Sequence, residues 1–147
     1  MTADPVAAVK WRSKASVEDP ARVNQVLAAV NALALAGGAD PRYVGQVFRD
    51  QIAATEAVEY GLFAQCKLDP YAAPSTAPDL SSSRAQIDVL NHTMVSEIVD
   101  QSALLHGPEC AGTRADAVAT ASEVRQLDAL HRQALEFATR SYCLPPD

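Results

Sequence analysis

Polar side chains interrupt the apolar face of the longest predicted helix. The apolar positions Phe48 and Ile52 continue, at helical spacing, onto Thr55 and Glu59. Residues four apart lie on the same side of a helix, and an amphipathic helix normally keeps charge off its apolar side. Thr55 and Glu59 are therefore predicted to sit together on a face that the fold buries.

Three cations hold similar positions on other predicted helices. Lys10 lies four residues after a valine, Arg22 four residues before one, and Arg84 three residues before an isoleucine. A single cation at the edge of an apolar stripe usually extends to water. Three that converge inside a helical bundle would need an anion, and because the chain is acidic overall, such a pocket would be selective. The spacing predicts a site for a small polyanionic ligand, which periodicity alone cannot name.

Composition narrows the classes of partner. The 147 residues include 12 Lys and Arg against 18 Asp and Glu, a net charge of −6, so we expect no nucleic acid as a general partner. No apolar run reaches the roughly 18 residues that would suggest a membrane span. The histidines are dispersed, and no two cysteines have the spacing of a metal or redox motif, so we expect no metal site.

Proline and glycine signals divide the chain into helices. Asp-Pro pairs precede three helical patterns, where Asp can cap a helix and Pro fits its first position. A fourth such pair opens a proline-rich loop over 69–79. No alternating strand pattern competes with the helical periodicity. The prediction is an all-α, single-domain helical bundle over residues 1–147, with helices at 5–13, 20–36, 41–67, 80–105 and 112–142, the last in one or two pieces.

The cysteines and the first residues each leave two interpretations open. Cys66, Cys110 and Cys143 permit either one disulfide with one free thiol or three reduced thiols. The opening MTADPVAAVK carries no signal peptide. The protein is therefore either cytosolic, or a leader has been removed and Met1 added.

Five stretches of the sequence resemble the secreted, all-helical chorismate mutases of the gamma subclass, in the same order and spacing. This resemblance implies the chorismate mutase helical bundle and the Claisen rearrangement of chorismate to prephenate. The reaction is intramolecular and needs no nucleophile, metal or cofactor, only conformational restraint and electrostatic stabilisation. The stretches are VAAVKWR (6–12), VEDPARV (17–23), VFRDQIAATEAVEYGLF (47–63), APDLSSSRAQIDVLN (77–91) and ATRSYCLPPD (138–147).

The same resemblance assigns roles to the polar residues on the stripes. Lys10 would donate to the ether oxygen of chorismate, where negative charge grows as the C–O bond breaks. Arg22 and Arg84 would hold the carboxylates, Glu59 the ring hydroxyl side, and Thr55 a carboxylate or its neighbouring water. The resemblance also implies secretion or a periplasmic location, and one disulfide.

Two departures from the family affect the expected activity. The family has a further N-terminal helix with another substrate-binding arginine, which is missing here, and Val26 stands where relatives tend to have a glutamine that donates to the ether oxygen. Truncation, an arginine from another subunit and lost activity all remain open. Without that helix we expect an open apolar groove beside Lys10, and either self-association into a homodimer or a mobile N-terminal segment. The implied disulfide joins Cys110 to Cys143 and leaves Cys66 free.

Two alternatives compete with chorismate mutase activity. The first is a homologue of the same fold that binds a related dianion, with activity lost or changed, for example to the elimination of pyruvate from isochorismate. The second is a non-catalytic helical interaction module, whose polar stripe residues would be ordinary surface features.

Overall fold

All regular structure in the computed structural model, which describes residues 3–69, 71 and 79–143, is helical. This confirms the all-α prediction. The helices are α1 (Ala3–Ser13), α2 (Pro20–Gly37), α3 (Pro41–Leu68), α4 (Leu80–Asp100), α5 (Ser102–Leu105), α6 (Cys110–Val124) and α7 (Ala129–Ala138).

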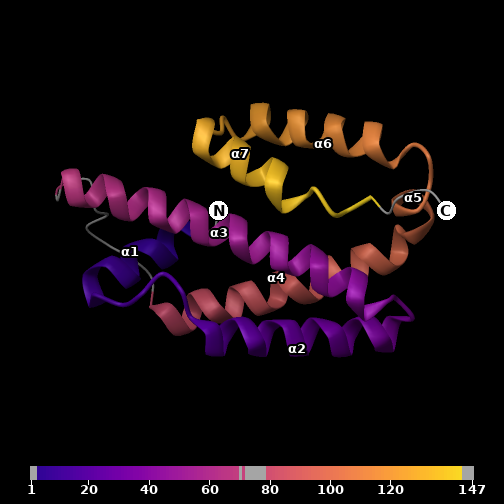
Figure 1. Ribbon diagram of the computed structural model, residues 1–147, viewed down its shortest axis with the longest axis horizontal. Helices are drawn as coiled ribbons and strands as arrows, with labels where there is room; N and C mark the ends of the chain where they lie inside the picture. Colours follow the sequence, from indigo (N-terminus) through magenta and orange to yellow (C-terminus); the bar gives the residue numbers. More distant parts are fainter. Residues whose placement is uncertain (1–2, 70, 72–78, 144–147) are drawn as a thin grey trace.

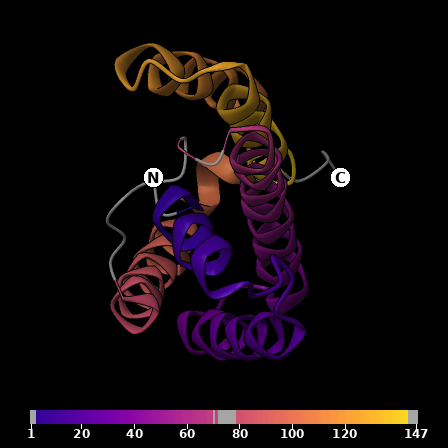
Figure 2. The same ribbon diagram turned by 90° about the vertical axis from the view of Figure 1, so that its left-hand side faces the viewer.

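Helix α3 is the central element of the bundle (Figure 1). It packs against α2 on one side and α7 on the other, and α1 packs against its C-terminal half. Helix α4 packs along α2. Helix α1 contacts both α3 and α4 and lies between them when the molecule is viewed from its end (Figure 2). Helices α1, α2, α3 and α4 are therefore packed together.

Two apolar clusters hold this arrangement. The larger joins α2, α3 and α4, and the smaller joins α1, α3 and α7. Helices α3 and α7 are in close contact at Gly61, where an added Cβ would meet Leu130 Cδ2 and displace the end of that side chain. The larger cluster contains Val26, Val30, Ala34, Val44, Val47, Phe48, Val95 and Ile98, and the smaller contains Ala3, Ala54, Val58, Ala134 and Ala138.

Helix ends follow the predicted signals in two of three cases. The Asp19 and Asp40 carboxylates accept hydrogen bonds from the backbone N–H groups of Arg22 and Arg42, which caps α2 and α3. The predicted start at residue 5 is wrong, because α1 already includes Ala3. Proline is tolerated in the first turn, where no intrahelical N–H is needed.

The second half of the chain departs from the predicted boundaries. The single helix predicted over 80–105 is interrupted at Gln101, and the short α5 brings Leu105 against the larger core cluster. The region predicted over 112–142 starts earlier, at Cys110, and forms two helices. Most of the predicted loop over 69–79 lies outside the described residues.

A disulfide joins Cys110 to Cys143, and the buried Cys66 is free. Both agree with the pairing that the family resemblance implied. None of the described helices is long and apolar enough to span a lipid bilayer.

Candidate active site

A cavity of about 260 Å³ opens between α1, α2, α3 and α4. It contains every side chain that the sequence singled out for the polyanion site, although these come from four separate helices. Their convergence is what the interrupted apolar stripes predicted. The six predicted positions among the residues that line it are Lys10, Arg22, Val26, Thr55, Glu59 and Arg84.

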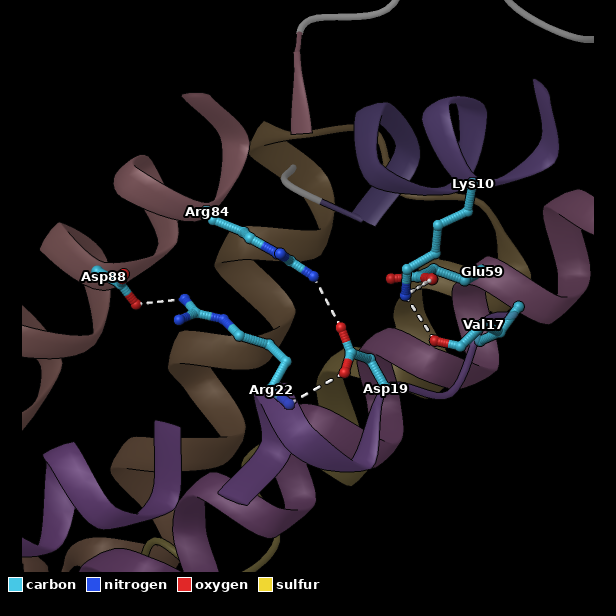
Figure 3. A network of polar contacts seen from close by, with 7 residues as sticks. All are labelled: Lys10, Val17, Asp19, Arg22, Glu59, Arg84 and Asp88. Carbon is cyan, nitrogen blue, oxygen red and sulfur yellow. Dashed lines mark hydrogen bonds and ion pairs between the residues drawn. The ribbon is translucent and has the colours of Figure 1, made fainter. Parts of the chain in front are cut away.

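Lys10 and Glu59 form the most buried ion pair of the cavity (Figure 3). The Lys10 ammonium donates to Glu59 Oε2 at 2.8 Å and to the backbone oxygen of Val17 at 2.5 Å. The Lys10 side chain is 12% exposed and that of Glu59 is 3% exposed. An ammonium has three donors, so one N–H of Lys10 remains for an acceptor in the cavity.

The environment of Glu59 opposes its ionisation. Burial raises the pKa of Glu59 above its ordinary value, and the hydrogen bond and positive charge of Lys10 offset this only in part. Glu56, one turn earlier on α3 and also on the cavity wall, raises the pKa further. A buried carboxylate with a raised pKa, beside a single cation in a cavity, is typical of functional sites.

Two arginines lie at the other side of the cavity and extend in opposite directions, each toward a protein carboxylate (Figure 3). Arg84 Nη2 donates to Asp19 Oδ2 at 2.7 Å, and Arg22 Nη2 donates to Asp88 Oδ1. Asp19 also receives the backbone N–H of Arg22 at 3.0 Å, so this carboxylate both caps α2 and orients Arg84.

The remaining predicted positions, Thr55 and Val26, offer fewer hydrogen-bonding groups to a ligand. The Thr55 hydroxyl donates to the backbone oxygen of Gln51 at 2.9 Å, so only its lone pairs face other partners. Val26 is buried in the larger core cluster and adds an apolar section of wall.

Local sequence patterns did not predict several polar residues at the cavity: Asp19, Gln51, Glu56 and Asn91 line it, and Asp88 lies beside it as the partner of Arg22. The Asp-Pro pattern predicts Asp19 only as a helix cap, although its distance of three residues from Arg22 places both at the same end of α2. Asp88 lies four residues after Arg84, and that spacing could have marked it as a neighbour on one helix face. Gln51 lines the cavity one turn before Thr55.

Comparisons with known proteins agree with this geometry. The family model described as chorismate mutase type II matches residues 2–60. The secreted chorismate mutase of Mycolicibacterium smegmatis is 56% identical over 145 residues, which cover 97% of this chain and 78% of that protein. The secreted chorismate mutase of Mycobacterium tuberculosis is 49% identical over 146 residues, covering 98% of this chain and 73% of that protein.

A solved structure extends the similarity to the fold. The chorismate mutase of Burkholderia thailandensis superposes with a TM-score of 0.90 at 31% identity, covering 97% of this chain and 90% of that one. Two observations define the class of protein. One is the cavity between four helices with its cations, and the other is the sequence identity over nearly the whole chain. The chain belongs to the chorismate mutase family, and it is similar in sequence to secreted members of that family.

Proposed function

We propose that the cavity binds chorismate and catalyses its rearrangement to prephenate. The observation that carries this proposal is the set of three cations, Lys10, Arg22 and Arg84, around one small cavity in an acidic protein. A volume of about 260 Å³ suits a small metabolite rather than a large cofactor. Family membership supports the same reaction.

The two arginines would hold the two carboxylates of the substrate. A guanidinium presents a planar fork that matches a carboxylate with two parallel hydrogen bonds. Because Arg22 and Arg84 come from different helices, α2 and α4, the distance between their forks would be fixed by helix packing. Fixed forks would select the compact conformer in which the two reacting ends of chorismate lie close together.

Lys10 would stabilise the charge that develops during bond breaking. In the transition state negative charge grows on the ether oxygen, and the free N–H of the Lys10 ammonium can donate to it. Val17 and Glu59 fix the ammonium from the other side, so little reorganisation would be needed when the charge appears. Glu59 would thereby orient Lys10 and also accept from the ring hydroxyl.

The test of this proposal is the disappearance of chorismate, followed by its ultraviolet absorption. The wild-type protein should convert chorismate to prephenate, and Arg84→Ala should raise KM strongly. Arg114→Ala removes the same charge from α6, outside the cavity, and should leave the kinetics unchanged. Absence of turnover with intact, folded protein would contradict the proposed reaction.

A binding measurement addresses the site independently of turnover. A dicarboxylate that mimics the transition state should raise the melting temperature of the wild-type protein, and Arg84→Ala should abolish that shift. A shift that survives in Arg84→Ala would place the ligand elsewhere. Pyruvate release from isochorismate, assayed in parallel, would favour the altered-activity alternative instead.

We also propose that the protein acts outside the cytoplasm. The disulfide between Cys110 and Cys143 supports this, because such bonds persist in oxidising compartments. Both mycobacterial relatives are named as secreted proteins. Immunodetection in cell and culture-medium fractions should find the native protein outside the cytoplasmic fraction, and a wholly cytoplasmic protein would contradict this.

A homodimer is the assembly we propose. Its support is a second groove, of about 530 Å³, beside the first turn of α1. The exposed Leu90 lines it together with small apolar side chains and several polar ones, and exposed apolar surface often becomes a partner surface. Light scattering should give twice the chain mass of 15.6 kDa, whereas the mass of one chain would reject the dimer.

A further inference from the structure

Asp19 and Asp88 hold the two cavity arginines in different ways. Asp19 is fixed, because it stands at the N-cap of α2 and its two oxygens accept from the Arg22 backbone and the Arg84 side chain. Its place is set by the start of the helix. Asp19 is therefore a permanent part of the cavity wall.

Asp88 has a single contact among the described residues, the one with Arg22. It lies within α4, one turn after Arg84, and its side chain is 54% exposed. Because no cap or second donor holds this carboxylate, a rotation about its side-chain bonds would turn it to water. Asp88 is the displaceable partner of the two.

The contact between Arg22 and Asp88 uses one nitrogen of the guanidinium, Nη2. Paired, parallel hydrogen bonds between a guanidinium and a carboxylate are stronger and more specific than a single one. A substrate carboxylate that approaches the fork of Arg22 in the cavity can thus form a better contact than Asp88 has. Substrate and Asp88 compete for one cation.

We propose that Asp88 is a residue that sets substrate affinity, an internal carboxylate that pairs with Arg22 until the substrate replaces it. This inference rests on the proposed function of the cavity. In the absence of substrate, Asp88 holds the guanidinium at the rim and neutralises it. On binding, the carboxylate of the dianion takes the fork of Arg22, and Asp88 turns to water.

We expect the exchange of Asp88 for the substrate carboxylate on Arg22 to affect KM and not kcat. The exchange happens on binding, before the chemical step, so it weakens the ground-state and transition-state complexes equally. In Asp88→Asn we expect KM to fall by about two- to five-fold, the range that an exposed ion pair is worth, with kcat unchanged. Asparagine has nearly the same shape and helix propensity as aspartate, so folding should be preserved.

Two controls separate competition from a general effect of charge. Asp100→Asn removes the same charge from the far end of α4, outside the cavity, and should leave KM unchanged. In the Arg22→Gln background, Asp88→Asn should no longer lower KM, because the cation for which Asp88 competes is gone. An unchanged or raised KM in Asp88→Asn overturns the inference, and so does a fall that persists in the Arg22→Gln background.

Calorimetry with an oxabicyclic dicarboxylic acid, which mimics the transition state, gives a readout that does not need turnover. Asp88→Asn should bind this probe about two- to five-fold more tightly than the wild type. Tighter binding in a protein that does not convert chorismate would support the role of Asp88 and reject the proposed function. If Asp88→Asn and the wild type bind the probe equally tightly and the protein converts chorismate, the proposed function stands and the role of Asp88 is rejected.

Discussion

Two buried carboxylates on α3, nine residues apart, meet opposite surroundings. Asp50, 1% exposed, accepts hydrogen bonds from Arg140 at 2.7 Å, Ser141 at 2.5 Å and Gln46 at 3.1 Å. Burial alone would raise the pKa of Asp50, but these donors and the charge of Arg140 outweigh it and hold the pKa below its ordinary value. Glu59, 3% exposed, has one such partner, Lys10, and burial keeps its pKa raised.

The difference distinguishes a structural carboxylate from a functional one. Asp50 joins α3 to the residues that follow α7, and its hydrogen-bonding capacity is taken up by the protein itself. Glu59 holds a lysine at the wall of a cavity and keeps capacity for a further donor. A buried charge whose environment opposes it has a stability disadvantage, and functional sites are where such disadvantages concentrate.

The largest effect on stability should come from the segment that Asp50 anchors. Cys143→Ser opens the disulfide, which spans a sequence separation of 33 residues, and should lower the free energy of unfolding by about 3–4 kcal/mol in the chain-entropy model. Urea denaturation measures this. Cys66→Ala, which keeps the disulfide, should cost clearly less. Equal losses in the two variants would mean that the bond adds no constraint of its own.

The largest effect on activity should come from the partner of Glu59. Lys10→Ala removes the donor to the ether oxygen and should lower kcat/KM by about 10²- to 10³-fold, the range for loss of one preorganised transition-state donor. Steady-state kinetics on chorismate measure this. Lys67→Ala, at the exposed end of α3, is the matched control. Wild-type kcat/KM in Lys10→Ala would remove the lysine from the proposed mechanism.

A smaller effect, on stability alone, is expected at Asp50 itself. Asp50→Asn keeps the shape but removes the charge, and should cost about 1–3 kcal/mol. The lower part of that range is favoured because the Arg140 side chain is 52% exposed and can turn to water. Activity per folded molecule should stay at the wild-type level. Loss of activity without loss of stability would make Asp50 functional and erase the contrast with Glu59.

Local periodicity predicted the burial of Glu59 but not the burial of Asp50, for a physical reason. Glu59 follows Phe48, Ile52 and Thr55 along one face, so its burial can be inferred from α3 alone. The burial of Asp50 depends on Arg140 and Ser141, about 90 residues away in sequence. The periodicity of one helix carries no information on which hydrogen-bond donors from distant parts of the sequence will contact it.

The same limit applies to the fold and to the rim of the cavity. Helix types and most ends were predictable because caps, prolines and apolar spacing are local. The interruption at Gln101 was not, because no proline or glycine marks it in the sequence, and the α5 that follows packs Leu105 against the larger core cluster. The pairing of Arg22 with Asp88 likewise depends on how α2 packs against α4.

The pH dependence of activity and of stability should separate the two carboxylates most finely. The ordinary pKa values are 4.5 for Glu59 and 3.8 for Asp50, and the folded protein raises the first and lowers the second. As pH falls, Glu59 should take up a proton first and release Lys10, so kcat/KM should decline while the fold is intact.

The stability contributions of the two groups have opposite signs. Asp50 stabilises the fold above its unfolded-state pKa, and that contribution is lost as pH falls through its lower folded-state pKa. Glu59 contributes stability below its unfolded-state pKa, and that contribution is lost as pH rises through its raised folded-state pKa. Acid unfolding, followed by circular dichroism, should therefore occur at lower pH than the loss of kcat/KM.

Because Glu56 helps to raise the pKa of Glu59, Glu56→Gln should move the acid limb of kcat/KM slightly toward lower pH and leave acid unfolding nearly unchanged. If activity and structure are lost together at one pH, in the wild type and in Glu56→Gln alike, the acid limb reports unfolding, and Glu59 does not control it.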